Sequence, residues 1–196
     1  MQGQTLTVPF NPNASTISQG AWKDDVFACT RYGIFHPSLL LACCCSPVLL
    51  GQVMTRLKLD VLGDPAPNGE WKGTFRTMVY IFVGYAILNL VLHPSDSYDY
   101  ARGYAQSDPS VLYSALSFTF TVFMIYGVMK VRNSIRMRDQ IPEEQCIGCE
   151  DLVCAAVCQC CTISQMARQT TDYDLKEGHF FTSDGLPPTL APVIVV

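Results

Sequence analysis

Two long uncharged apolar runs dominate the hydrophobic pattern of this chain. They cover residues 77–93 and 109–129 and contain no Asp, Glu, Lys or Arg. An apolar helix needs roughly 20 residues to cross about 30 Å of hydrocarbon, a length that the first run reaches with its flanking residues. The pattern therefore predicts two membrane-spanning helices, at about residues 75–93 and 109–130, that form a two-pass hairpin.

Basic residues flank these two runs but are scarce between them. The flanks carry Arg56, Lys58, Lys72, Arg76, Lys130, Arg132, Arg136 and Arg138, whereas the connector carries only Arg102. The positive-inside rule then places both flanks, and with them both termini, in the cytosol. The alternative is a pair of buried helices in a soluble domain, for which 196 residues are enough. The charge asymmetry argues against that alternative.

A further uncharged stretch precedes the first predicted span. Residues 32–55 carry no Asp, Glu, Lys or Arg, but Pro37 and Pro47 interrupt them. An interior proline removes a helix hydrogen bond and clashes with the preceding turn. We therefore expect a broken interfacial or re-entrant segment here, rather than a third crossing. The turn-rich residues 59–73 predict a loop.

The second predicted span continues past the membrane as a helix that ends near Pro142. Arg132 and Arg136 lie on neighbouring turns of this extension, so its basic face is expected to rest on anionic cytoplasmic lipid. The two ends of the chain are polar or proline-rich, and the N-terminal one has neither a signal sequence nor the Met-Gly start of myristoylation.

These patterns predict an all-α membrane protein with a two-pass transmembrane hairpin, cysteine-rich interfacial helices and flexible termini. We expect a flexible tail at residues 1–21, a cysteine-rich membrane domain at residues 22–168 and a second flexible tail at residues 169–196. Integral membrane localisation follows, and the plasma membrane is the expected location.

Composition agrees with a membrane protein and argues against several functions. Charged residues make up 15% of the chain and its mean hydropathy is +0.20, whereas soluble domains carry about 25% charged residues. A net charge of −4 without a basic stripe argues against nucleic-acid binding. His36, His93 and His179 are far apart in sequence, and neither a G-x-S-x-G motif nor a P-loop occurs, so we do not expect an enzyme.

Ten cysteines are the main candidates for chemistry. The predicted topology places them on the reducing side of the membrane, where thiols, thiolate ligands or acylated cysteines are expected. Cys154, Cys158 and Cys161 have i, i+4, i+7 spacing, which puts three thiols on one stripe of a helix. Two C-x-x-C pairs, Cys146 with Cys149 and Cys158 with Cys161, supply four thiolates for a tetrahedral zinc or softer cadmium ion.

Three interpretations of the cysteines stay open. In the first, they are small apolar residues packed against the hairpin. In the second, the juxtamembrane residues Cys43, Cys44 and Cys45 are S-palmitoylation sites. In the third, a subset binds zinc or another soft divalent ion, and the best-spaced ligands are Cys146, Cys149, Cys158 and Cys161.

Several motifs also follow a characteristic order along the chain. They are Trp22, Phe27 and Cys29, then Cys43 to Cys45 before Gly51 and Gln52, then an Arg-x-x-x-Arg, a Cys-x-x-Cys and Cys160-Cys161 before Gln165. This order resembles the placenta-specific-eight, or cysteine-rich, family over residues 22–168. The chain departs from the family at Ser46 and Pro47, where relatives often have Cys-Pro-Cys, and at Ser164, where a cysteine often precedes the glutamine.

That family includes plant cadmium-resistance proteins, fruit-weight and cell-number regulators, and cornifelin. The resemblance implies a small membrane protein in divalent metal homeostasis or transport, with zinc, cadmium and calcium as the candidate ions. The alternative is a non-catalytic membrane scaffold or regulatory subunit, including one in cell-number and growth regulation. Two helices cannot enclose a pore, so besides the lipid bilayer we expect a homo-oligomer or a membrane-protein partner.

Overall fold

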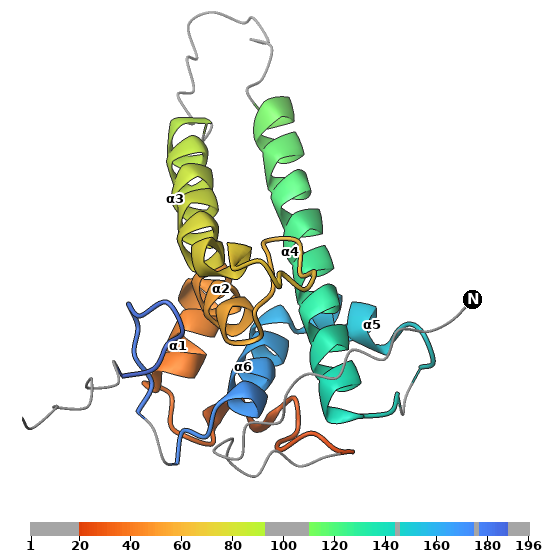
Figure 1. The fold of residues 1–196 in the computed structure, drawn as a ribbon. Helices are drawn as coiled ribbons and strands as arrows, with labels where there is room; N and C mark the ends of the chain where they lie inside the picture. The colour runs from red at the N-terminus through yellow and green to blue at the C-terminus, as the bar shows by residue number, and fades with distance from the viewer. Residues whose placement is uncertain (1–19, 93–109, 144–145, 175–176, 188–196) are drawn as a thin grey trace, which may run out of the picture.

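The computed structural model describes residues 20–92, 110–143, 146–174 and 177–187 (Figure 1). Its elements, in chain order, are the 3-10 turn η1 (Ala28–Thr30), α1 (Pro37–Cys44), α2 (Ser46–Arg56), the 3-10 turn η2 (Glu70–Gly73), α3 (Thr74–Leu92), α4 (Ser110–Asp139), α5 (Glu150–Val157) and α6 (Gln159–Thr170). Within the described ranges the predicted all-helical fold is confirmed. The predicted connector and the outer parts of both predicted tails lie outside these ranges.

The long helices α3 and α4 coincide with the two predicted spans. Figure 1 shows them side by side, rising away from the four shorter helices, with the end of α3 near the start of α4. The rings of Tyr85 and Phe120 stack between them with their centroids 3.8 Å apart. Both helices are long and apolar enough to cross a membrane, and only 6% and 17% of their apolar windows are buried inside the protein.

The hydrophobic core lies where the lower half of α4 meets α2 and α6. Leu50 and Met54 from α2, Val128 and Ile135 from α4 and Ile163 from α6 are fully buried there. Close packing of aliphatic side chains from three helices is the main source of stability at such a junction. The base of α4 is therefore held by the short helices, whereas its upper half contacts α3 and leaves side chains such as Val111 and Phe118 exposed.

Cys45 breaks the helical segment between α1 and α2. Its backbone dihedrals are φ −139° and ψ 51°, outside the helical region. Pro37 opens α1 and Pro47 lies in the first turn of α2, positions where a missing N–H costs no helix hydrogen bond. The predicted broken segment is thus confirmed, although its place relative to a bilayer stays a prediction.

A second break of the same kind separates α5 from α6. Cys158 lies between these helices with φ −137° and ψ 69°. The predicted stripe of Cys154, Cys158 and Cys161 on one helix is therefore wrong, because Cys154 belongs to α5 and Cys161 to α6. Neither proline nor glycine lies at this break, and cysteine spacing alone does not indicate where a helix ends. The sequence therefore did not predict the break.

The basic extension of α4 faces the interior of the protein. Arg132 and Arg136 are only 1% and 8% exposed. Arg132 pairs with Glu150 at 3.3 Å and lies 4.2 Å above the ring of Trp22, while Arg136 pairs with Asp151 at 2.7 Å. The prediction that this face rests on anionic lipid is wrong, because the acidic start of α5 folds back and neutralises it.

The segment that follows α6 returns to α2. The Gln52 amide nitrogen donates hydrogen bonds to the carbonyl oxygens of His179, Phe180 and Thr182, at 3.3, 3.0 and 2.9 Å. The two N–H groups of this buried amide are shared among the three backbone carbonyls, and this fixes the path of that backbone. Residues 177–187 thus pack on α2, whereas the sequence predicted a flexible tail.

Candidate metal centre

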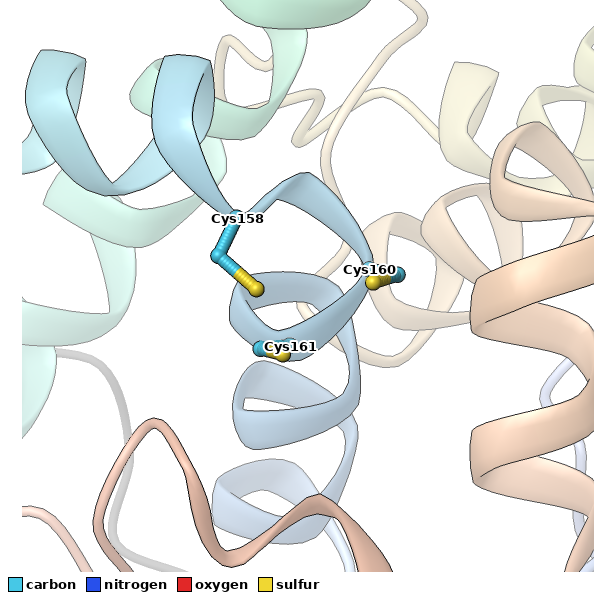
Figure 2. Close-up of side chains that lie close together, drawn as sticks. All are labelled: Cys158, Cys160 and Cys161. Carbon is cyan, nitrogen blue, oxygen red and sulfur yellow. The ribbon is translucent and has the colours of Figure 1, made fainter. Parts of the chain in front are cut away.

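The first turn of α6 carries the candidate metal centre. Cys158 caps the helix, and Cys160 and Cys161 lie in its first turn. The three sulfur atoms lie within 4.8 Å of one another, and all three residues are half-buried (Figure 2). We refer to Cys158, Cys160 and Cys161 as the thiol triad.

The break at Cys158 is what makes these sulfurs converge. The single O–H of Thr162 is shared between the carbonyl oxygens of Cys154, at 2.8 Å, and Cys158, at 2.9 Å, and so bridges the end of α5 to the start of α6. A Cys-x-x-Cys inside a continuous helix converges less well than one at a turn. In addition, the free N–H groups and the dipole at a helix N-terminus favour negative charge such as that of thiolates.

The spacing of the triad suits a soft divalent ion. A zinc–sulfur bond of about 2.3 Å places tetrahedral sulfur ligands about 3.8 Å apart, which small side-chain rotations reach from the observed separation. Thiolates are the ligands that zinc and softer ions prefer. Three protein ligands also leave one position open, as in sites where an ion exchanges ligands.

The Cys161 thiol of the triad is held in its protonated form. Burial raises the pKa of Cys161, and side-chain hydrogen bonds with Cys158 and Cys29 raise it further. Burial also raises the pKa of the nearby Cys154, against the opposing charge of Arg132. An incoming ion must therefore displace protons, so the affinity for metal is expected to rise with pH.

Cys146 and Cys149, the other predicted ligand pair, form a disulfide. The turn between them contains Gly148, whose φ of 83° suits glycine, and it brings the two Cα atoms to 5.4 Å. The sequence predicted thiols, thiolate ligands or acylated cysteines, whereas the structure has a disulfide at this pair. Oxidised sulfurs offer no thiolate, so in this state the pair does not contribute to a four-thiolate site.

Of the four predicted ligands, the structure brings Cys158 and Cys161 together and adds Cys160. Cys160 was not among the predicted ligands, because the prediction relied on C-x-x-C pairs. The run Cys-x-Cys-Cys was the available signal, since consecutive cysteines at the start of a helix lie in one turn.

The predicted acylation sites lie at the end of α1, which packs against α6. Cys43 and Cys44 are exposed and Cys45 is half-buried. Burial raises the pKa of the Cys43 thiol, and the neighbouring Cys160 raises it further through its charge and a side-chain hydrogen bond. The two cysteine clusters, far apart in sequence, therefore meet at the α1–α6 contact.

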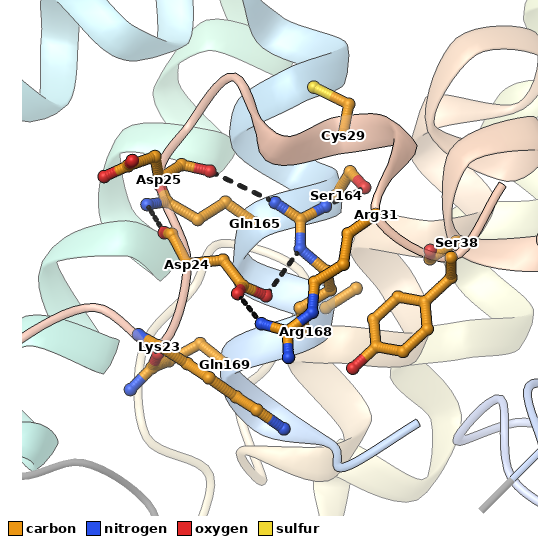
Figure 3. Close-up of polar contacts among 12 residues, drawn as sticks. Lys23, Asp24, Asp25, Cys29, Arg31, Ser38, Ser164, Gln165, Arg168 and Gln169 are labelled. Atoms are coloured by element: carbon orange, nitrogen blue, oxygen red, sulfur yellow. Dashed lines mark hydrogen bonds and ion pairs between the residues drawn. The ribbon is translucent and has the colours of Figure 1, made fainter. Parts of the chain in front are cut away.

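The N-terminal segment is also fastened to α6, one to two turns after the triad (Figure 3). The guanidinium of Arg168, whose side chain is 1% exposed, pairs with the Asp24 carboxylate at 3.2 Å. The Gln165 amide donates to the Asp24 carbonyl oxygen at 2.8 Å, and Arg31 pairs with the same carboxylate. These contacts position η1, which carries Cys29, beside the triad.

A family model described as the PLAC8 family matches residues 22–169. This range agrees with residues 22–168, over which the motif order resembles the family, and it contains every cysteine of the chain. No curated protein and no solved structure matches the chain.

Proposed function

The chain belongs to the PLAC8 family, as its motif order predicted, and on this premise we propose that it is an integral membrane protein in divalent metal homeostasis or transport. The thiol triad binds a soft divalent ion, zinc or cadmium. Calcium, a hard ion, is the alternative candidate for the ion that the protein handles. The protein binds and passes on the ion and does not act as an enzyme.

Exposed apolar surface supports insertion into a bilayer. Leu90 and Val91 on α3 are 82% and 72% exposed, and Val111 and Phe118 on α4 are 76% and 71% exposed. Apolar surface of this extent is not left in water by a soluble protein, whereas lipid tails cover it at no cost. The lipid bilayer is therefore the first partner. We propose that this bilayer is the plasma membrane and that both termini lie in the cytosol.

The observation that carries the metal role is the convergence of the thiol triad to within 4.8 Å. Packing alone does not require three thiols in one helical turn beside Cys43 and Cys29. Two helices cannot enclose a pore, so transport requires a homo-oligomer or a membrane-protein partner to which the triad delivers its ion.

Metal content of the purified protein tests this function. Protein purified in detergent under reducing conditions is titrated with cadmium and with zinc, and bound metal is counted by mass spectrometry. We expect on the order of one ion per chain for the wild type and a large loss for Cys160→Ser. Cys45→Ser is the matched control, because it changes a half-buried cysteine at the equivalent helix break.

A wild type that takes up no thiol-bound metal on titration overturns the metal role. The alternative then stands, namely a non-catalytic membrane scaffold or regulatory subunit, including one in cell-number and growth regulation. Under that alternative the cysteines pack or carry lipid, and Cys160→Ser changes stability rather than metal content, by about 1–3 kcal/mol for a buried hydroxyl.

A further inference from the structure

The disulfide between Cys146 and Cys149 lies in an exposed turn at the start of α5. Ile147, between the two cysteines, is 93% exposed, Gly148 is also exposed, and both cysteines are half-buried. Cys149 is the N-cap of α5, which packs against the lower half of α4 (Figure 1). A thiol from solution can therefore approach this bond without unfolding of the protein.

The place of this bond relative to the membrane is unusual for a structural disulfide. The start of α5 neutralises Arg132 and Arg136 on the extension of α4, and the proposed topology has that extension in the cytosol. Glutathione and dithiol proteins keep cytosolic thiols reduced, so disulfides that form there are usually transient, catalytic or redox-sensing. A bond at this position is therefore expected to open and close.

We propose that Cys146 and Cys149 form a reversible thiol–disulfide exchange site, whose reaction partner is a small thiol of the glutathione class. The proposal rests on the cytosolic placement in the proposed function and is independent of metal binding by the thiol triad. It assigns a role to the predicted ligand pair that the structure does not bring into the triad.

The exchange consists of two substitutions at sulfur. The thiolate of a first glutathione attacks the Cys146 sulfur and bonds to it, and Cys149 leaves as a thiolate that takes a proton from solvent. A second glutathione thiolate attacks the glutathione sulfur of this mixed disulfide, which releases glutathione disulfide and a Cys146 thiolate that is protonated in turn. Two electrons thus pass from two glutathione molecules to the protein, and the reverse reaction with glutathione disulfide closes the bond.

The position of Cys149 favours its departure in the first step. A helix N-terminus favours negative charge on a group placed there, and exchange is faster when the leaving sulfur is a stable thiolate. The two acidic residues that follow Cys149 are paired with Arg132 and Arg136, which offsets their repulsion of a thiolate. Attack on Cys146 is therefore the faster route.

Backbone contacts hold the two cysteines near each other after the bond opens. The Cys146 carbonyl oxygen accepts a hydrogen bond from the Cys149 N–H at 3.1 Å. The Gly148 N–H donates to the Glu143 carboxylate, which also pairs with Arg136 at 2.5 Å. A short turn that is held in place loses little chain entropy when its ends are joined, so the bond closes again readily.

Redox titration of the full-length, metal-free protein in detergent tests the proposal. The protein is equilibrated with mixtures of reduced and oxidised glutathione in the presence of a chelator. Free thiols are then alkylated, and mass spectrometry measures the closed fraction of the pair. We expect this fraction to follow the glutathione ratio reversibly, and we expect Cys149→Ser to hold one glutathione on Cys146 as a stable mixed disulfide.

Two glycine variants form a matched test of the turn. Gly148 and Gly69 have φ of 83° and 87°, and an added Cβ meets no atom within 4 Å at either position. Gly148→Ala strains the closed turn, and opening relieves that strain. The variant should therefore need about 5- to 30-fold more oxidised glutathione for half-closure, which corresponds to the roughly 1–2 kcal/mol of a left-handed residue. Gly69→Ala, which carries the same strain far from the disulfide in sequence, should leave the closed fraction unchanged.

A pair that stays closed in the folded protein at every glutathione ratio, or that never closes, overturns the exchange site, and so does an equal shift in the two glycine variants. Labelling of the pair in intact cells by a membrane-impermeant maleimide contradicts the cytosolic placement and overturns the proposal through its premise. Metal binding is read separately, as cadmium uptake by the thiol triad. Loss of that uptake would overturn the metal role and leave the exchange result intact.

Discussion

The same arrangement, a short helix, a cysteine break and a second helix, occurs twice in this protein and serves different chemistry each time. In α1–Cys45–α2 and α5–Cys158–α6 the break residue has nearly the same backbone dihedrals. The first break is followed by Ser46 and Pro47, and the second by Gln159, Cys160 and Cys161. A shared backbone geometry thus brings thiols together into a candidate metal centre only where the first turn of the second helix carries cysteines.

We refer to α1–Cys45–α2 as the α2 unit and to α5–Cys158–α6 as the α6 unit. The two units bind segments from opposite ends of the chain. Gln52 follows Cys45 by seven positions, as Gln165 follows Cys158, and both glutamines are buried. Gln52 holds the C-terminal segment through backbone carbonyls, whereas Gln165 holds the N-terminal segment and accepts a hydrogen bond from Arg132. The α6 unit therefore controls the segment that carries Cys29, and the α2 unit does not.

The largest expected difference between the units comes from their arginines. Arg168→Met removes the buried partner of the Asp24 carboxylate, whose side chain is 5% exposed, and we expect a loss of about 3–5 kcal/mol in unfolding free energy. Arg56→Met removes hydrogen bonds to uncharged acceptors such as the Asp184 carbonyl and the Tyr173 hydroxyl, and is expected to cost about 1–3 kcal/mol. Denaturant unfolding in detergent measures both values.

Cadmium affinity provides the second readout for this pair of variants. Arg168→Met frees η1, which lies beside the triad, so the cadmium affinity should fall, whereas Arg56→Met should leave the affinity unchanged. Arg31→Met is the control, because Arg31 also pairs with Asp24 but from an exposed position, where an ion pair contributes little. Equal losses for Arg31→Met and Arg168→Met would contradict the role assigned to the buried pair.

Local patterns in the sequence predicted the long helices and the first break, because length, hydropathy and proline act on short stretches of chain. They did not predict that Arg132 and Arg136 are buried. Their partners, Glu150 and Asp151, lie in the next helix, and only the tertiary fold brings those acids onto α4. A basic stripe on a helix looks the same in sequence whether lipid or an acidic helix covers it.

The candidate site was predictable in kind but not in membership. Cysteine spacing pointed to the run around Cys158, yet spacing along one helix cannot show that η1 and α1, from more than a hundred residues earlier in the chain, pack against α6 and bring Cys29 and Cys43 near it. Those contacts depend on the packing of α1 against α6 and on the Arg168–Asp24 pair. Clusters assembled by packing lie beyond what periodicity within one element describes.

A smaller difference in unfolding free energy is expected between the positions that precede the two glutamines. These positions are Gly51 in α2 and Ser164 in α6. A Cβ added at Gly51 would lie 2.9 Å from the Met78 Cβ and 3.5 Å from the Phe75 Cα of α3. Gly51→Ala therefore forces α2 and α3 apart, and we expect a loss of about 1–3 kcal/mol in unfolding free energy. The position in α6 tolerates a side chain, because the Ser164 hydroxyl accepts a hydrogen bond from Arg168.

Gly84→Ala is the matched control in α3. A Cβ at Gly84 meets no atom within 4 Å, so alanine should be neutral or gain up to about 1 kcal/mol of helix propensity. A similar effect for Gly51→Ala and Gly84→Ala would show that α2 and α3 are not in the close contact described here. Cadmium binding by Gly51→Ala should match the wild type, since this contact belongs to the unit without the triad.

The smallest expected difference concerns pH and the caps of the first helix in each unit. His36 caps α1, with its Nδ1 accepting a hydrogen bond from the Ser38 N–H at 3.3 Å, whereas the equivalent cap of α5 is Cys149, whose sulfur is in the disulfide. Burial lowers the pKa of His36 below 6.5, and the charge of Arg168 lowers it further. The rings of Tyr32 and Tyr173 face the imidazole at 5.1 and 4.9 Å.

When a histidine has a lower pKa in the folded state than in the unfolded state, protons bind the unfolded chain first as the pH falls. This binding lowers the unfolding free energy. The contribution of His36 is therefore fully present above about pH 6.5 and is lost as the pH falls from there toward the folded-state pKa. Because protonated Nδ1 cannot accept the Ser38 N–H, acid weakens the start of α1, and with it the position of Cys43, but leaves α5 unaffected.

Unfolding measured from about pH 7 to about pH 5 should show this loss in the wild type but not in His36→Asn, which keeps a capping side chain that does not titrate. The same pH dependence in both proteins would assign it to other groups, and the carboxylates with lowered pKa, such as Asp172 beside Lys23, titrate well below this window.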